Sequence, residues 1–361
     1  MDDIGVRDAA KRDPVGFARG LPHGSVIDEA QMVPELFRAV KLIVDQRRVA
    51  GQFVLTGSSN ISTMPHLSES LAGRVAIFTL RPFAQYEVAG KRGSVVEDLF
   101  DTAHRWDVEP VDQTNLIERL TAGGYPEACD SSSVRARDLW FSNYINTMMQ
   151  RDIRDLAQIA DTAAIYRLLA DVTSRSGQIR NITKIASTTE IAAKTVERYM
   201  NTLEQAYLIS TIPAWRAGIP GRKSAAPKVV ANDSGLAAFQ LHADFDRLSK
   251  DRNLLGPLLE TFVINEVLKH ASWSDEPPNV LHYREKDAVE VDIVLENRRR
   301  ECIAIEVKAT SSPTERDFRG LYHILADERL NVVQGVLVYT GSTIIPRNER
   351  LKAIPVSMFW S

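Results

Sequence analysis

The chain has 361 residues, more than one ordinary hydrophobic core accommodates, so two or three domains are expected. Its net charge of -3 excludes a positive electrostatic potential over the whole surface. Any contact with nucleic acid must therefore come from a local patch of basic residues. No apolar run approaches the roughly 18 residues of a membrane span and the acidic N-terminus lacks a signal-peptide core, so we expect a cytoplasmic protein without a membrane partner.

Short apolar segments alternate with a helical pattern in the first part of the chain. Residues 25–27 and 52–55 are expected strands, and residues 37–46 between them have helical apolar spacing. A third strand is expected at residues 74–80. This alternation is typical of a parallel sheet.

Polar residues follow the first two of these strands. Asp28 and Glu29 end the first strand, and Thr56 and Ser58 end the second. Ligands bind at the carboxyl ends of parallel strands, so Asp28 is a candidate to hold Mg²⁺ through its water shell, and Glu29 to polarise an attacking water. Thr56 is at the position that lies between the acids and the γ-phosphate in additional-strand ATPases (the sensor position). Ser58 is a second candidate contact for the nucleotide. Arg74 is a candidate contact for a γ-phosphate, and a surface ion pair is its alternative.

The middle of the chain is helical and then changes character. Residues 91–165 are expected to form a helical lid or linker. Residues 166–235 have three short helices followed by a strand, which is the order of a winged helix-turn-helix. The acidic residues among these helices leave DNA contact and a partner-facing role equally open, and Arg198 is the first recognition-helix residue to test. The turn at residues 214–227 is either a solvated basic loop or a wing that contacts phosphates, through Arg216, Arg222 and Lys223.

Residues 236–361 have the order helix, three strands, helix, strand. Asp292 lies on one of these strands, and Glu306 and Lys308 share a face of the next. A hairpin brings them together in the Asp…Glu-x-Lys arrangement of restriction-endonuclease-like folds. The two carboxylates would hold a divalent metal and the lysine would steady an attacking hydroxide. An ion pair between Glu306 and Lys308 without a catalytic role is the alternative.

The helix before these strands offers a further metal ligand. Glu260 and Glu266 are six residues apart on it, so they face directions about 120° apart and only one of them can serve. We take Glu266 as the candidate metal ligand.

The order and spacing of these segments resemble the prokaryotic AAA-type ATPases that carry a C-terminal DUF4143 region. The resemblance covers the chain from about residue 10, and it implies ATP and Mg²⁺ as cofactors, a homo-oligomer with shared sites, and a nuclease-like fold for the last region. The matching strings are Ile27-Asp28-Glu29-Ala30-Gln31, Pro34-Glu35-Leu36, Leu55-Thr56-Gly57-Ser58-Ser59, Glu69-Ser70-Leu71-Ala72-Gly73-Arg74, Leu80-Arg81-Pro82-Phe83, Gly123-Gly124-Tyr125-Pro126-Glu127, Arg151-Asp152-Ile153, Lys228 and Asp233-Ser234-Gly235-Leu236.

One element of the family pattern is missing from the sequence. The 27 residues before Asp28 contain no Gly-x-x-x-x-Gly-Lys-Ser/Thr loop, whose backbone N–H groups would cradle the phosphates. We therefore expect ATP binding to be weak or absent. Either the sequence starts downstream of the natural start, or the protein is a natural remnant.

The expected architecture is thus α/β throughout. Residues 1–90 form a P-loop NTPase (AAA-like) parallel sheet without its Walker A strand and loop, followed by the lid or linker at 91–165, the winged helix at 166–235 and a restriction-endonuclease-like domain at 236–361. Three functions remain open: an ATPase-type protein associated with DNA, a non-catalytic module that binds DNA or protein, and a metal-dependent nuclease.

Overall fold

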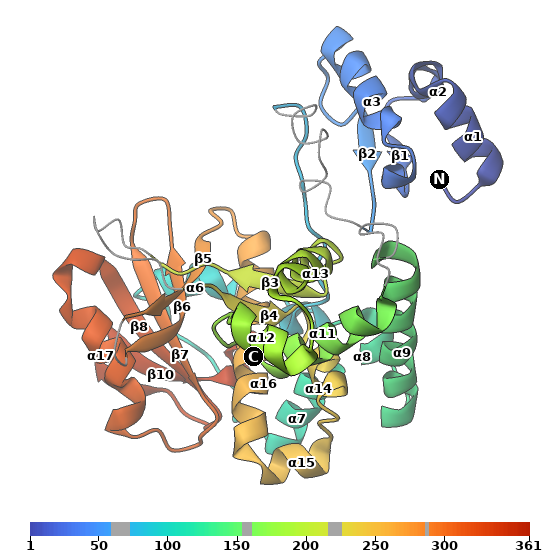
Figure 1. Cartoon of the computed structure of the whole chain (residues 1–361). Helices are drawn as coiled ribbons and strands as arrows, with labels where there is room; N and C mark the ends of the chain where they lie inside the picture. Colours follow the sequence, from blue (N-terminus) through green and yellow to red (C-terminus); the bar gives the residue numbers. More distant parts are fainter. Residues whose placement is uncertain (59–72, 154–160, 216–225, 286–288) are drawn as a thin grey trace.

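The computed structural model describes residues 1–58, 73–153, 161–215, 226–285 and 289–361, which form a mixed α/β structure. The N-terminal unit is a two-stranded parallel sheet with helices around a small core that contains Ile27 and Phe37. Figure 1 shows this unit projecting from the rest of the molecule. Its elements are α1 (Ile4–Arg12), α2 (Pro14–Gly20), β1 (Ser25–Ile27), η1 (Ala30–Met32), α3 (Glu35–Gln46) and β2 (Phe53–Leu55).

The prediction of a third strand at residues 74–80 is wrong. These residues pair with none of the described strands, and the side chains of Phe78 and Leu80 are 88% and 100% exposed. Apolar residues in an extended segment form a strand only where a neighbouring strand accepts their backbone hydrogen bonds and a layer covers their side chains. Neither is present around this segment in the described part of the chain.

The segment that follows is helical, as expected, and much of it packs into the C-terminal core. Val95, Leu99 and Leu116 lie in the same buried cluster as Ile293 and Val336 of the large sheet. The helices that cover the sheet on this side are α5 (Gln85–Val88), α6 (Val95–Phe100) and α7 (Gln113–Ala122). The remaining elements pack in a second buried cluster, with the residues that follow them in the chain: α8 (Pro126–Cys129), α9 (Val134–Thr147) and the π-helical η3 (Met148–Ile153).

A helical module follows, by which we mean the described residues from 162 to 232. Asp161 and Asn181 cap its first two helices by accepting backbone N–H groups, and the left-handed Glu190 (φ 57°) separates the second helix from the third. Its two strands pair antiparallel. Residues 216–225 of the expected basic turn lie outside the described residues. The elements are α11 (Thr162–Ser174), α12 (Ile182–Thr189), α13 (Ala193–Gln205), β3 (Ile209–Ile212) and β4 (Lys228–Ala231).

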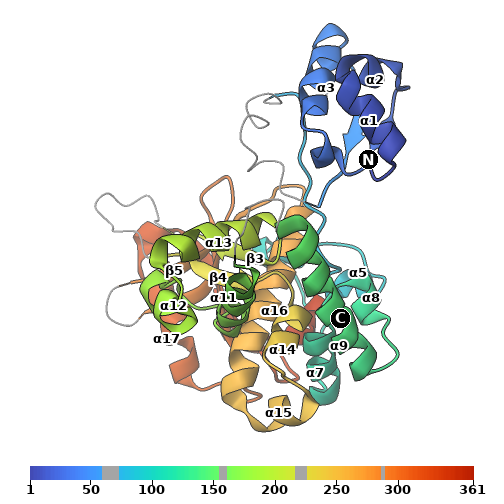
Figure 2. The same ribbon diagram turned by 45° about the vertical axis from the view of Figure 1, so that its right-hand side comes forward.

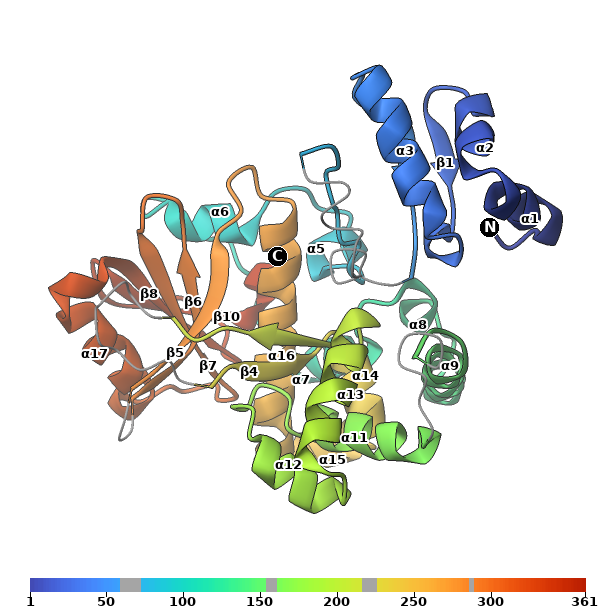
Figure 3. The same ribbon diagram turned by 45° about the horizontal axis from the view of Figure 1, so that its top comes forward.

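The C-terminal region is a six-stranded mixed sheet between two helices. The strand order is β5-β6-β7-β8-β10-β9, with β7, β8 and β10 parallel. Alternate residues of the strands pack against α16 on one face and α17 on the other, as Figures 1 and 3 show. The elements are α14 (Ser234–Gln240), α15 (Phe245–Lys250), α16 (Arg252–Ser272), β5 (Asn279–Arg284), β6 (Glu290–Glu296), β7 (Cys302–Lys308), η4 (Glu315–Phe318), α17 (Arg319–Ala326), η5 (Glu328–Leu330), β8 (Val332–Tyr339), β9 (Ile345–Asn348), β10 (Leu351–Pro355) and η6 (Val356–Phe359).

Backbone hydrogen bonds fasten the helical module to this sheet. The N–H of Trp215 donates to the carbonyl of His282 (2.7 Å), and the N–H of His282 donates to that of Pro213 (3.0 Å). Figure 2 shows the module lying against α16. Among the described residues, no helix has the length and apolar character needed to cross a membrane.

Candidate functional site

The parallel pairing of β1 and β2 brings together the polar residues that follow these strands. Ile27 is the register partner of Leu55, so Asp28 and Thr56 are adjacent, and the Thr56 hydroxyl donates to the Asp28 carboxylate. Gln31 donates to Glu29 and also, over 3.2 Å, to the hydroxyl of Ser58. The carboxylates and hydroxyls at this edge fit a hydrated Mg²⁺, but the sequence holds no phosphate-binding loop to complete a nucleotide site.

Arg74 lies elsewhere on the N-terminal unit. Its Nε donates to Asp45 of α3 over 2.5 Å, and this hydrogen bond lowers the pKa of the Asp45 carboxyl. The structure thus places Arg74 in the ion pair that the sequence offered as its alternative. Its role toward a γ-phosphate stays a prediction.

The β6–β7 hairpin brings the C-terminal acids together. Ile293 pairs with Ile305, so Asp292 and Glu306 follow one step further along the two strands. The Asp292 carboxylate accepts the backbone N–H of Val307 over 2.9 Å. Lys308 donates to Oε1 of Glu306 over 2.5 Å, whereas Oε2 of Glu306 is buried and has no hydrogen-bond partner among the described residues.

A lysine from the helical module completes this arrangement. Lys228 is the first residue of β4 and only 1% exposed. Its ammonium lies 2.8 Å from Glu260 of α16 and 3.1 Å from both Glu290 and Asp292 of β6. The site is therefore assembled from three parts of the chain: the module, α16 and the sheet.

Burial and proximity shift the ionisation of these groups. Burial, together with the neighbouring Asp292 carboxylate, raises the pKa of Glu260 to about 8 and that of Glu306 to about 8. Burial also raises the pKa of Asp292, but Lys228 and Lys308 lower it more, so its pKa lies below the usual value. Burial alone would lower the pKa of Lys228, and the three carboxylates around it reverse that direction.

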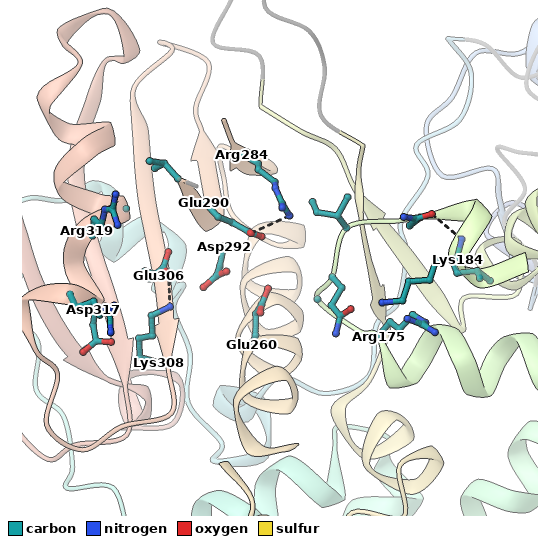
Figure 4. Close-up of a pocket in the computed structure, with 18 residues that line it drawn as sticks. Arg175, Lys184, Glu260, Arg284, Glu290, Asp292, Glu306, Lys308, Asp317 and Arg319 are labelled. Carbon is teal, nitrogen blue, oxygen red and sulfur yellow. Dashed lines mark hydrogen bonds and ion pairs between the residues drawn. The ribbon is translucent and has the colours of Figure 1, made fainter. Parts of the chain in front are cut away.

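The acids line a cavity of about 790 Å³ between the helical module and the sheet. Figure 4 shows Glu260, Asp292 and Glu306 on one side of it and Lys184 on the other. Exposed cations form its rim, and none of the following three makes an ion pair with a described residue: Lys184 of α12, Arg316 of η4 and Arg319 of α17.

Glu266, the helix carboxylate expected to bind metal, lies away from this cavity. It is fully buried, accepts the N–H of Gln85 over 2.7 Å and pairs with Lys269 over 2.8 Å. Glu260, which the sequence left as the other choice, lines the cavity instead. The sequence analysis named Lys228 only as part of the family pattern and gave it no role at this site, because no local pattern links it to Glu260, 32 residues further along the chain.

Family models match three parts of the chain. A model described as an AAA domain matches residues 2–89, and models described as domains of unknown function match residues 113–247 (DUF8612) and 255–359 (DUF4143). The chain carries an AAA domain followed by a C-terminal DUF4143 region. This confirms the resemblance drawn from the sequence. The DUF8612 match spans the helical module and part of the helices before it.

Two curated relatives match nearly the whole chain. One is an uncharacterized protein of Mycobacterium bovis and the other an uncharacterized protein of Mycobacterium tuberculosis, each 29% identical over 346 residues. The matches cover 95% of this chain and 70% of each relative. Asp292, Glu306 and Lys308 fall within the part of the chain that the DUF4143 model matches.

Proposed function

We propose that the DUF4143 region binds the phosphate backbone of DNA in the cavity and carries a metal-dependent phosphodiesterase centre there. The observation that supports this most directly is the convergence of Asp292, Glu306 and Lys308 on the wall of a cavity whose rim is cationic. Acids in the centre and cations around them suit a phosphodiester, since the rim attracts phosphates and the acids attract the metal.

The residues fit a divalent cation of the Mg²⁺ kind. Mg²⁺ needs only one or two carboxylates and keeps several waters, so Asp292 and Glu306 suffice as its protein ligands. The unpartnered Oε2 of Glu306 is the oxygen that remains available for it. When bound, such an ion would activate water and neutralise charge on the phosphate. Lys308, which pairs with Glu306, would supply the ammonium that steadies an attacking hydroxide.

DNA binding is tested by reversing the charge of Lys184 on α12 and, as a control, of Lys194 on α13. Lys184→Glu removes a rim cation, whereas Lys194→Glu makes the same charge change at an exposed residue of α13 that does not line the cavity. In a fluorescence anisotropy titration with a DNA duplex, Lys184→Glu should weaken binding and reduce the salt slope by about 1, and Lys194→Glu should do neither. Equal effects of the two variants would refute the cavity as the binding surface.

Cleavage is tested by plasmid nicking with Mn²⁺. Asp292→Ala and Glu306→Ala should each abolish nicking that the wild-type chain shows, because each removes a metal ligand. Nicking that survives either substitution would place the reaction elsewhere. DNA binding without nicking in the wild type would leave the cavity as a binding site and contradict the catalytic part of the proposal.

A further inference from the structure

The ammonium of Lys228 occupies a position that usually belongs to a bound cation. Three carboxylate groups, of Glu260, Glu290 and Asp292, lie 2.8 to 3.1 Å from it. An ammonium buried to this degree is stable only when acids pair with it, and acids this close together can all be ionised only when a cation lies between them. The lysine and the three acids therefore depend on one another.

The backbone around Lys228 is held on both sides. Lys228 pairs with Ile212 of β3 and forms a bridge with Ile179 on its other side, and the N–H of Arg180 donates to the carbonyl of Pro227 over 2.8 Å. The side chain thus starts from a fixed position and reaches the acids across the boundary between the module and the sheet. A side chain on a rigid strand suits a permanent counter-ion better than a cation that moves in and out of the site.

Lys228 approaches the acids from behind the cavity. Glu260, Glu290 and Asp292 line the cavity, but Lys228 does not. Its ammonium lies among these carboxylates, and no group of three or more His, Cys, Asp or Glu side chains in the described residues converges in a way that would hold a metal. Among the described acids that line the cavity, Glu306 has a buried oxygen, Oε2, without a hydrogen-bond partner, and Asp292 lies opposite Glu306 on the neighbouring strand.

We propose that Lys228 permanently takes the place of a second divalent cation, so that the centre is assembled without metal and admits a single ion, between Asp292 and Glu306. The number of ions in the centre rests on the proposed function, but the role of Lys228 toward the three acids does not. Removing the ammonium should therefore create a second cation site from Glu260, Glu290 and Asp292.

The test counts Mn²⁺ ions bound to the full chain, without DNA, by calorimetry and electron paramagnetic resonance. Lys228→Met keeps the length of the side chain and removes its charge, and Lys228→Arg keeps the charge. We expect Lys228→Met to bind one more Mn²⁺ than the wild type and to gain more in melting temperature when Mn²⁺ replaces EDTA, and Lys228→Arg to match the wild type. An unchanged count and an unchanged Mn²⁺ effect in Lys228→Met would overturn the proposal. A wild type with no Mn²⁺ and a Lys228→Met variant with one would support it, while contradicting the metal centre of the proposed function.

A second variant keeps the inference testable if Lys228→Met does not fold. Glu260→Gln leaves Lys228 with two acids and, because Glu260 serves the lysine rather than the metal, should leave the number of Mn²⁺ ions bound by the wild type unchanged. Loss of a wild-type Mn²⁺ ion in Glu260→Gln would assign Glu260 to the metal and overturn the role of Lys228 as its cation.

Discussion

His270 makes the folded chain sensitive to acid in a way that can be calculated. It is fully buried on α16, and its Nδ1 accepts the backbone N–H of Val95 over 3.3 Å. The ring packs against Tyr86 and Trp273, with centroids 4.9 and 4.8 Å away. A protonated Nδ1 would lose this hydrogen bond and place a charge among aromatic rings. Burial, with a further contribution from Lys269, accordingly lowers the pKa of His270 to about 3.

The sign and size of the effect follow from proton linkage. In the unfolded chain a histidine has a pKa of about 6.5, so below that pH the unfolded state gains a proton that folded His270 takes up only near pH 3. The contribution of neutral His270 to the unfolding free energy is thus fully present above pH 6.5 and decreases as the pH falls toward 3. Between pH 7.5 and 5.0 the difference is about 1.5 pH units at ~1.4 kcal/mol per unit, or about 2 kcal/mol.

Urea unfolding of the wild type and of His270→Gln at pH 7.5 and 5.0 measures this difference. Glutamine keeps an acceptor for the Val95 N–H and does not titrate. The wild type should lose about 2 kcal/mol more than His270→Gln over this pH interval. His23→Gln, at an exposed histidine of the N-terminal unit, serves as the control and should follow the wild type. Equal pH dependence of the wild type and His270→Gln would refute the reasoning.

Two further predictions concern the buried network and the nucleotide. Lys269→Met leaves the fully buried Glu266 without its cation and should cost ~3–5 kcal/mol of unfolding free energy. Adding Glu266→Gln to the same chain should restore part of this free energy. Additive effects of the two substitutions in urea unfolding would contradict the pairing. Calorimetry of the 361-residue chain with Mg-ATP should give binding weaker than micromolar, because no Gly-Lys-Ser/Thr loop is present to hold the phosphates, and micromolar affinity would contradict this.

The strands and acids of the C-terminal region were predictable because the information is local. Runs of mostly apolar residues define β6 and β7, and the polar turn at residues 297–301 between them fixes their register. Once the register is fixed, Asp292 must lie beside Glu306. The β9 and β10 strands were missed because their apolar runs are shorter, and Pro346 interrupts β9.

The choice between Glu260 and Glu266 needed the tertiary structure. Most of α16 is buried on more than one side, so the usual distinction between an apolar and a polar helix face does not identify which acid faces a site. Glu266 instead meets Gln85, from a segment 181 residues away in the sequence. The place of Lys228 at this site was missed for the same reason, since its partner Asp292 lies 64 residues further along the chain.

These long-range contacts mean that the DUF4143 region does not contain the whole candidate site. A fragment limited to residues 255–359 would retain Glu260, Glu290 and Asp292 but lose Lys228, and three buried or half-buried acids without their cation repel one another. The same fragment would lose the helices at residues 95–120, which complete one face of the core under the sheet. Inactivity or misfolding of such a fragment would therefore carry no information about the centre, and the chemistry of Asp292 and Glu306 has to be measured in a chain that includes the helical module.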